Sequence, residues 1–370
     1  MRPSMLFRRI KSLWIVLNAR VSATTLALCV ASVPALAQYK PLTDHLLERA
    51  EAGHLQEQLD AAYAFQLGLG VRRDPVEAAQ WFRKAADQGS PEAQSQLGFL
   101  YRTGSGVQQD DREAFKWFER AALENYAPAQ FNLAISLVQG WGASRDFSQA
   151  AHWMMRAAQQ GFPLAQTNLA IFYFRGYGVP VSQAECIRWL RRAAKTHFAP
   201  AEFLLGTLYR ASPPLGIANN PPEAARWYRR AAQQGYAPAQ TGLGVLYHEG
   251  SGVPADPEQA RRWYRLAAEQ GYGRAVANLA LNYADGHPAR ADLASAYFWA
   301  LLALHHSAVL DPPLPTSFAD NLRARLSPEE ATRIKAQVQE WVKTHPSDQD
   351  TEHDDWFSLP VAESNNRVPE

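Results

Sequence analysis

Few side chains in this protein could carry chemistry. The sequence has two cysteines, Cys29 and Cys186, and one tandem histidine pair, His305-His306. A thiolate could serve as a nucleophile, and two histidines could bind a metal ion. Adjacent residues of a helix point about 100° apart, so the histidine pair makes a poor chelate. Cys186 stands where six similar segments of the chain have alanine, which indicates a buried, inert thiol.

Paired glycines such as Gly104/Gly106 and Gly140/Gly142 could suggest a phosphate-binding loop. They have no third glycine and no preceding strand, and they separate two segments of helical periodicity, so we interpret them as turns. The chain also contains no G-x-S-x-G, H-E-x-x-H or C-x-x-C motif. We therefore predict a protein that is not an enzyme, with no catalytic residue, no metal site and no cofactor.

The charge and composition exclude further classes of protein. The 370 residues carry 37 basic and 36 acidic side chains, a formal net charge of +1, which creates no global field to recruit nucleic acid. The arginine pairs Arg191-Arg192 and Arg229-Arg230 have acidic neighbours, and we interpret them as solvated helix faces. With 47% hydrophobic and 20% charged residues, the chain is neither wholly disordered nor a polytopic membrane protein.

The first 37 residues have the composition of an export signal. They contain five basic residues and no acidic one, and an apolar run begins at Val21. The run ends in Ala35-Leu36-Ala37, the small-x-small pattern that signal peptidase accepts, so we place cleavage between Ala37 and Gln38. Loss of five positive charges leaves 32 basic and 36 acidic residues, net −4, with Cys186 as the only cysteine. We expect a periplasmic protein without an internal disulfide.

Three other interpretations of this region stay open. A second apolar patch from Leu13 to Leu17 favours an uncleaved membrane anchor. The pair Arg8-Arg9 could belong to a twin-arginine signal, and the residues before Cys29 are similar to a lipoprotein box. The apolar run is short for a membrane span, the residues after Arg8-Arg9 fit the twin-arginine pattern poorly, and Leu28 is too large for the lipoprotein box. We therefore expect no stable membrane insertion after cleavage, and secretion or membrane anchoring are the alternatives.

Tryptophan recurs through the rest of the chain at a nearly constant period of 36, 36, 36, 38, 36 and 36 residues. The residues are Trp81, Trp117, Trp153, Trp189, Trp227, Trp263 and Trp299. Alanine stands three residues before each one, except at Cys186, and four residues after each one. Positions i, i+3 and i+7 form one buried face of a helix, here named helix B. A period of this length indicates stacked helical repeats.

Each helix B begins with a residue suited to cap a helix amino terminus. These residues stand seven positions before the tryptophans and are Asp74, Asp110, Asp146, Ser182, Asn220, Asp256 and Asp292. The side-chain oxygen of such a residue accepts a backbone N–H of the first turn. We expect helix B to end at a residue that tolerates the left-handed conformation, which is glycine in four repeats and Asn125 or His197 in two others.

A second helix, helix A, follows each of these caps. A leucine recurs at Leu97, Leu133, Leu169, Leu205, Leu243 and Leu279, with alanine four residues earlier and tyrosine or leucine four residues later. This spacing also marks one helical face. Directly after each leucine stands glycine or alanine, which predicts a close contact with another helix.

These residues resemble the Sel-one-like repeat family, a relative of the tetratricopeptide repeat. The family pattern A-x-x-x-L-G-x-x-Y-x-x-G-x-G-V-x-x-D-x-x-x-A-x-x-W-x-x-x-A-A is almost intact from Ala93 to Ala122 and recurs at 239–268. The resemblance implies an all-α fold, a right-handed α-solenoid of about seven 36-residue helix-turn-helix repeats with helical caps. It also implies a protein that binds other proteins. Repeat 5 departs from the pattern, with Pro213-Pro214 and a two-residue insertion in its turn.

The pattern sets the expected boundaries. After the signal peptide at 1–37 we expect an N-terminal capping helix at 38–60, seven repeats at 61–304 and C-terminal capping helices at 305–345. Ile334, Val338, Trp341 and Val342 share one face of the last helix, as expected of a cap that shields an open end of the stack. The segment 346–370 is polar and acidic, and we expect a disordered tail.

The surface best suited to a partner is the face of helix A opposite its buried stripe. In tetratricopeptide-like stacks this face, at positions −2, +2 and +5 from the repeat leucine, lines the concave groove. The candidate groove residues are Phe99, Arg102, Phe131, Ile135, Val138, Ile171, Phe174, Phe203, Arg210 and His248. An apolar strip bordered by arginines suits a partner segment with apolar anchors. The alternative is that neighbouring helices cover these side chains.

We therefore expect an exported, non-enzymatic scaffold or regulator that binds a protein in this groove. The partner would be periplasmic or the ectodomain of a membrane protein. An alternative is a cell-envelope module that binds polysaccharide-assembly or peptidoglycan-processing machinery. A hydrolase ranks last, because the cysteine-rich relatives linked to β-lactam hydrolysis carry a cysteine pair in each repeat, and this chain carries none.

Mature protein isolated from cells should begin at Gln38, because the pattern Ala35-Leu36-Ala37 directs cleavage after Ala37. Intact mass and N-terminal sequencing of the periplasmic fraction measure this, and Ala37→Leu should leave the precursor uncut. Protein that starts at Met1 and stays in the membrane fraction would favour the uncleaved anchor instead.

Overall fold

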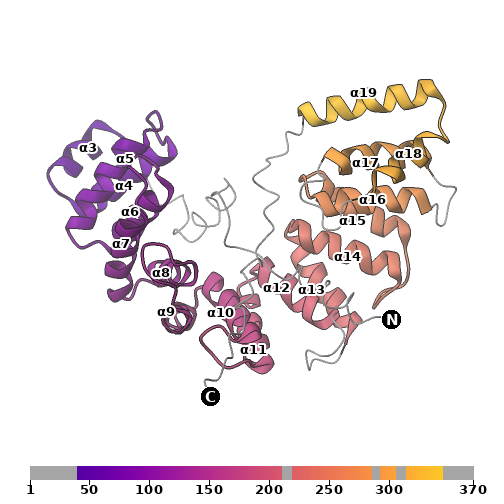
Figure 1. Cartoon of the computed structure of the whole chain (residues 1–370). Helices are drawn as coiled ribbons and strands as arrows, with labels where there is room; N and C mark the ends of the chain where they lie inside the picture. The colour runs from indigo at the N-terminus through magenta and orange to yellow at the C-terminus, as the bar shows by residue number, and fades with distance from the viewer. Residues whose placement is uncertain (1–39, 211–218, 286–291, 306–313, 345–370) are drawn as a thin grey trace, which may run out of the picture. The chain divides into compact units, whose positions relative to one another are not determined.

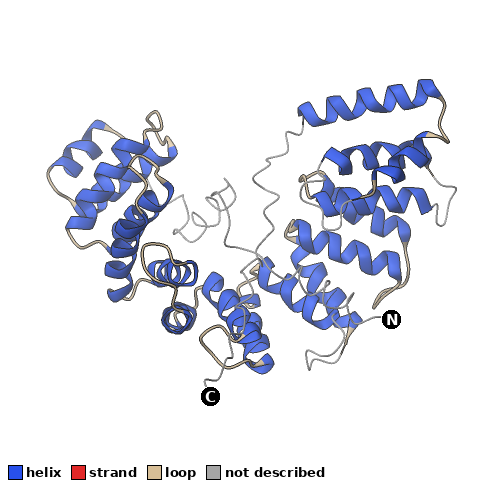
Figure 2. Cartoon of the chain, viewed as in Figure 1, coloured by secondary structure: helices blue, strands red, loops and turns tan. Residues whose placement is uncertain are grey.

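The computed structural model describes residues 40–210, 219–285, 292–305 and 314–344, which form α-helices joined by turns (Figures 1 and 2). No residue in these ranges belongs to a β-strand. The predicted signal peptide with its cleavage site, Pro213-Pro214, His306 and the segment 346–370 lie outside the described residues. The chain falls into two compact units, and the boundary between them lies between Ala231 and Ala232.

Helices pair along the chain as the repeat pattern predicted. The N-terminal unit contains α3 (Asp44–Glu51), α4 (Leu55–Leu67), α5 (Pro75–Asp87), α6 (Pro91–Thr103), α7 (Asp111–Leu123), α8 (Ala127–Gln139), α9 (Phe147–Gln159), α10 (Pro163–Arg175), α11 (Gln183–Ala194), α12 (Ala199–Arg210) and most of α13 (Pro221–Gln233). The C-terminal unit contains α14 (Ala237–Glu249), α15 (Pro257–Ala268), α16 (Gly273–Asp285), α17 (Leu293–His305), α18 (Thr316–Arg323) and α19 (Pro328–Thr344). Even-numbered helices from α4 to α16 are helix A and the helices that follow them are helix B, which confirms an all-α solenoid of helix pairs.

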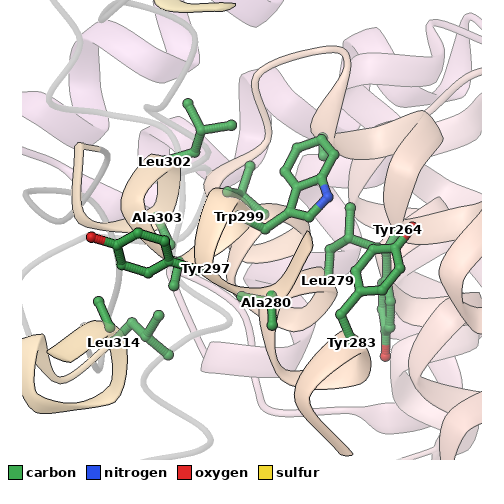
Figure 3. Close-up of a cluster of buried hydrophobic side chains, with 14 of the residues drawn as sticks. Tyr264, Leu279, Ala280, Tyr283, Tyr297, Trp299, Leu302, Ala303 and Leu314 are labelled. Carbon is green, nitrogen blue, oxygen red and sulfur yellow. The ribbon is translucent and has the colours of Figure 1, made fainter. Parts of the chain in front are cut away.

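Extra helices cover the first and last repeats. Leu46 and Ala50 of α3 are buried in the core that α4 and α5 share. At the other end Trp341 of α19 packs on α17, with its ring 5.6 Å from the ring of Trp299, and Ile334 is buried. Figure 3 shows side chains of α15, α16 and α17, with Leu314 before α18, gathered in this C-terminal core. Helix α4 begins at Leu55, within the range expected for the N-terminal cap.

All seven predicted amino-terminal caps of helix B form. In α7, for example, one carboxylate oxygen of Asp110 accepts the backbone N–H groups of Arg112 and Glu113, at N···O distances of 2.9 and 3.1 Å. The bond to the residue three positions further on is also made at Asp74, Asp146, Ser182, Asn220, Asp256 and Asp292. Asn125 and His197 have φ values of 60° and 58°, the left-handed conformation predicted for them. Local sequence therefore sets where helix B begins and ends.

Helix A and helix B of one repeat approach closely at the small residue after the repeat leucine. A Cβ atom added at Gly98 would lie 2.8 Å from the ring of Phe118, and one added at Gly244 would lie 2.6 Å from the ring of Tyr264. Gly206 stands in the same relation to Tyr228. Carbon atoms do not pack this closely, so in these three repeats the aromatic ring at the facing position requires glycine.

The small residue and the facing residue change together in the repeats after the first. The other three pairs are Ala134 with Met154, Ala170 with Leu190, and Ala280 with Ala300. A facing side chain without an aromatic ring leaves room for the extra methyl group of alanine. Repeat 1, at the end of the stack, combines Ala62 with Phe82 and does not follow this pattern.

The repeat tryptophans lie at the edge of the core. Trp81, Trp117, Trp189 and Trp299 are buried, but Trp153, Trp227 and Trp263 are only half-buried, so the predicted buried face of helix B is incomplete at these three. A cation three residues further on lies over the ring in five repeats, with Lys84, Arg120, Arg156, Arg192 and Arg230 as the cations. A cation over the π face of an indole is attracted to it, which contributes to holding these five rings in place.

In five of the seven repeats a buried glutamine on helix A ties the repeat to the helix that precedes it. Gln58, Gln94, Gln130, Gln166 and Gln240 each donate a side-chain amide hydrogen to the carbonyl oxygen of the alanine eight residues earlier. In three repeats the amide oxygen accepts a hydrogen bond from a second glutamine, which is Gln88, Gln160 or Gln270. Each of these carbonyl groups also accepts the backbone N–H three residues further on, as Ala86 does from Gly89, so the glutamine supplies a second donor at the end of the helix.

In repeat 5 an ion pair replaces the glutamine at this junction. Its helix A carries Glu202 in place of the glutamine, and the Glu202 side chain is 0% exposed. The Nη2 atom of Arg230 lies 2.7 Å from Oε1 of Glu202 and donates to the carbonyl oxygen of Ala194, at 3.3 Å. That second bond is the one that glutamine makes in the other repeats. The fold therefore depends here on a cation, because a buried carboxylate without one is strongly destabilising.

The close contact between Gly244 and Tyr264 predicts a compensating pair of substitutions. Gly244→Ala should destabilise the protein by about 1–3 kcal/mol through overpacking, although alanine alone would favour the helix by about 1 kcal/mol. The double variant Gly244→Ala with Tyr264→Leu copies Ala170 with Leu190 and should be more stable than the sum of the single effects. Urea denaturation of the three variants measures this coupling, and strict additivity would contradict it.

Candidate protein-binding surface

The predicted groove residues lie mainly on α6, α8, α10 and α12, which are the helices A of repeats 2 to 5 (Figure 1). Six large apolar side chains among them are half-buried, and we name this set the helix-A strip. It comprises Phe99, Phe131, Ile135, Ile171, Phe174 and Phe203. Each of these side chains keeps part of its surface accessible, so neighbouring helices cover the strip only in part.

Two predicted groove residues do not belong to this surface. Val138 is 0% exposed, so its assignment to the groove is wrong. It lies one turn after Ala134, which is also fully buried, and its short side chain stays on that packed face. His248 is exposed, but it lies on α14 in the C-terminal unit, where Nε2 is 3.8 Å from the Asp285 carboxylate. The surface is therefore confined to the N-terminal unit.

Two aromatic members of the strip, Phe131 and Phe203, stack with rings of their own repeats. The ring of Phe131 meets that of Phe162 edge to face, with centroids 5.7 Å apart. The ring of Phe203 stacks on that of Tyr228 at 5.6 Å. Such contacts hold each ring in one orientation while an edge stays accessible. Phe131 and Phe203 thus have a structural role as well, whereas Ile171 and Phe174 of α10 are better suited to test binding.

The arginines that border the strip stand in the last turns of helix A. These are Arg102 in α6, Arg175 in α10 and Arg210 in α12. The guanidinium of Arg102 lies over the ring of Trp141, 3.7 Å from its centroid, and its Nη1 atom is 3.5 Å from the Asp111 carboxylate. Burial lowers the pKa of the Arg102 guanidinium, and Asp111 partly offsets that effect. Arg102 is thus held in place from two sides.

The glycine pairs of the turns position the residues beside these arginines. Trp141 lies between Gly140 and Gly142, whose φ values are 78° and 74°. A Cβ atom at Gly142 would overlap the carbonyl oxygen of Asp111, so the turn lies directly on the start of α7 and brings Trp141 to Arg102. The predicted role of these glycines as turns is confirmed.

Sequence reasoning missed three residues at this edge, Trp141, Arg175 and Tyr177. Tyr177 occupies the position of Trp141 in the next repeat and stacks on Phe147, with ring centroids 5.0 Å apart. Burial raises the pKa of the Tyr177 hydroxyl and lowers that of the Arg175 guanidinium. The sequence did contain a signal for Trp141 and Tyr177. Both are aromatic residues between paired glycines, whereas the turns after α6 and α14 have serine at that position.

An open polar hollow lies beside this edge, between the start of α7 and the turn after α8. Its volume is about 770 Å³, and it is lined by Gln109, Asp110, Asp111, Arg112, Gly140, Gly142, Ala143 and Ser144. Small-molecule sites are usually enclosed and largely apolar, and this hollow is neither. Within the described ranges, no three side chains of histidine, cysteine, aspartate or glutamate come together as metal ligands would.

Cys186 of α11 is buried, as its register with the alanines predicted. Burial raises the pKa of its thiol to about 12, so the reactive thiolate is scarce at neutral pH. Among the described helices, none has both the length and the apolar character needed to span a membrane.

Comparison with known proteins identifies the repeats. The family model described as Sel1 repeat matches residues 58–90, 91–126, 127–162, 163–195, 199–236, 237–272 and 273–305. The crystal structure of a Sel1 repeat protein from Oxalobacter formigenes is 31% identical, with a TM-score of 0.61 over 76% of this chain and 79% of that one. A search of curated proteins finds no match.

Two more distant structures are also similar. One is c5321, a protective antigen of uropathogenic Escherichia coli strains displaying an SLR fold, with 24% identity and a TM-score of 0.45 over 87% of this chain and 76% of that one. The other is the immunity protein Pa5087 from Pseudomonas aeruginosa, with 21% identity and a TM-score of 0.40 over 63% of this chain and 84% of that one.

The burial of Cys186 predicts slow chemistry at its thiol. In the mature protein at neutral pH, a maleimide or disulfide reagent should react at least about 100-fold more slowly with the folded chain than with the urea-unfolded chain. A control with Cys186→Ala and Glu119→Cys, which places the thiol on an exposed position of α7, should react fast in both states. Equal folded and unfolded rates at Cys186 would contradict its burial.

Proposed function

This chain belongs to the Sel1 repeat family, and from that premise we propose that it is an exported, non-enzymatic scaffold that binds a protein partner along the helix-A strip. Stacked helical repeats present extended surfaces built from equivalent positions of successive units, and such surfaces suit protein ligands. The export signal predicted from the sequence at 1–37 supports a periplasmic location for both the protein and its partner.

The observation that carries this proposal is the partial exposure of the helix-A strip. Six large apolar side chains on α6, α8, α10 and α12 stay half-buried, although the opposite stripe of the same helices is buried almost completely. A row of accessible apolar groups across successive repeats lowers solubility, and a binding partner is a common reason for it. The other large exposed apolar residues, such as Leu123 and Val181, stand singly and need no such reason.

The rigidity of the strip supports the same function. Its side chains stand on helices, and edge-to-face and stacked contacts orient Phe131 and Phe203. A surface ordered before binding loses less conformational entropy when the partner arrives. A partner segment with apolar anchors at helical or extended spacing would contact several repeats at once.

Substitution of two strip residues should abolish binding without unfolding the protein. Ile171→Ser with Phe174→Ser removes two central apolar contacts, and central anchors supply about 2 kcal/mol each, or about 30-fold in affinity. Crosslinking and pull-down from periplasmic extract, with identification of the captured protein, measure the loss. Circular dichroism should show unchanged helicity, and the melting temperature should fall by only a few degrees.

The matched control is Leu123→Ser with Val181→Ser, which removes two apolar side chains that are 64% and 66% exposed and lie off the strip. This variant should capture the partner as the unmodified protein does. Equal capture by the strip variant would place the binding surface elsewhere. A large fall in melting temperature would show that Ile171 and Phe174 serve the core of the stack.

A further inference from the structure

Basic residues are concentrated in the second half of the N-terminal unit. Residues 146–231, from the cap of α9 to the unit boundary, contain ten arginines or lysines and four acidic residues, a net charge of +6. Residues 40–145 contain 11 basic and 14 acidic residues and are net negative. Eight of the ten cations lie in, or directly after, helix B of repeats 3, 4 and 5, which are α9, α11 and α13. The basic region is therefore mainly a property of helix B, whereas the helix-A strip lies on the other helices.

Pairing with carboxylates does not remove this charge. Three of the four acidic residues lie beside one arginine each, and the pairs are Arg188 with Glu185 at 2.8 Å, Arg226 with Glu223 at 3.3 Å and Arg230 with Glu202 at 2.7 Å. The fourth, Asp146, caps the amino terminus of α9. These contacts use every acidic side chain of the segment, so the net charge of +6 is what remains after pairing. A helix carboxyl terminus carries roughly half a negative charge, which is too little to offset such a surplus.

Three cations at the end of α11 contact neutral groups. Arg191 donates a hydrogen bond to the hydroxyl of Tyr209 at 2.7 Å, and the guanidinium of Arg192 lies over the ring of Trp189, 4.6 Å from its centroid. Lys195 directly follows the helix, and all three residues are exposed. A neutral partner orients a cation without neutralising it, so these charges remain available to an anionic ligand.

The cations of α11 share one face of the helix. Arg188, Arg191, Arg192 and Lys195 stand at positions i, i+3, i+4 and i+7. Arg226 of α13 occupies the position of Arg188, and Arg156 of α9 occupies that of Arg192, so the neighbouring repeats extend the same surface. We name these six residues the helix-B patch. All of them are exposed except Arg156, which is half-buried.

We propose that the helix-B patch binds the surface of an anionic phospholipid bilayer, with its guanidinium and ammonium groups on lipid phosphates. A guanidinium pairs with two phosphate oxygens at once, and each basic residue near an anionic leaflet strengthens binding roughly fivefold. Trp153 and Trp227 are half-buried on α9 and α13, and tryptophan is enriched where proteins meet the bilayer surface. The patch is spread over three helices, which favours a surface of many headgroups over a single acidic chain. The helix-A strip lies on other helices and would stay available to a protein partner.

Sedimentation with lipid vesicles tests this proposal, using the mature protein that begins at Gln38 so that the apolar run of 1–37 is absent. One set of vesicles is phosphatidylcholine alone, and the other contains about 40% phosphatidylglycerol. The protein should pellet with the anionic vesicles at about 50 mM salt, leave them at about 500 mM, and not pellet with phosphatidylcholine. Equal pelleting with both vesicles, or with neither, would overturn the inference.

A triple variant locates the binding surface. Arg191→Gln with Arg192→Gln and Lys195→Gln should weaken binding to the anionic vesicles about 100-fold, or roughly fivefold for each charge. If melting curves show that this variant does not fold, the single substitution Lys195→Glu should still weaken binding at least about tenfold. Unchanged binding by the folded variant would contradict the role of the patch.

The matched control lies on α7, the helix B of repeat 2. Arg112→Gln with Lys116→Gln and Arg120→Gln removes the same three positive charges, and Arg120 lies over Trp117 as Arg192 lies over Trp189. Because α7 also carries several acidic residues, this variant should bind the vesicles within about threefold of the unmodified protein. An equal loss in both triple variants would mean that total charge, not the helix-B patch, governs binding, and the proposal would fall.

Two further measurements separate the possible results. If soluble polyglutamate binds the protein and anionic vesicles do not, the patch takes an acidic polymer and the membrane proposal falls. Ile171→Ser with Phe174→Ser should bind the vesicles as the unmodified protein does, because these residues belong to the helix-A strip. Failure of vesicle binding is therefore distinct from failure of the proposed function, which depends on capture of a protein partner by that strip.

Discussion

The close approach of the two helices within each repeat is the contact on which the rest of the structure depends. The position directly after the repeat leucine holds glycine where an aromatic ring faces it, as in Gly98 with Phe118. It holds alanine where the facing side chain is smaller. That contact sets which face of helix A is buried. It therefore also decides which residues remain on the other face, where a partner can reach them.

Stacking these pairs creates a second requirement, because each junction between repeats buries polar backbone groups. One side-chain amide donates a second hydrogen bond to a helix-end carbonyl group in five repeats, from Gln58, Gln94, Gln130, Gln166 and Gln240. Glu202 and Arg230 satisfy the same junction in repeat 5 with an ion pair. The chemistry of the junction can therefore change while the hydrogen bond to the helix-end carbonyl group is kept.

The proposed binding surface follows from this architecture together with the length of particular side chains. Positions at the border of the buried face are covered when the side chain is short, as at Val138, and reach outward when it is long, as at Phe174 or Arg102. The turns contribute side chains to this surface, because Gly142 packs on the start of α7 and Trp141 beside it lies over the guanidinium of Arg102. A charged aromatic edge beside an apolar strip arises from these two effects together.

The sequence by itself determined the repeats, the helix ends and the burial of Cys186. All of these follow from short-range rules, namely a fixed period, a capping side chain next to its N–H groups, and register with neighbouring alanines. Only the tertiary structure decided that Val138 is covered, that His248 lies in the other unit, that Trp153, Trp227 and Trp263 stay half-exposed, and that Arg102 meets Trp141. These outcomes depend on which helices and turns lie around each side chain in space, which a one-dimensional pattern does not contain.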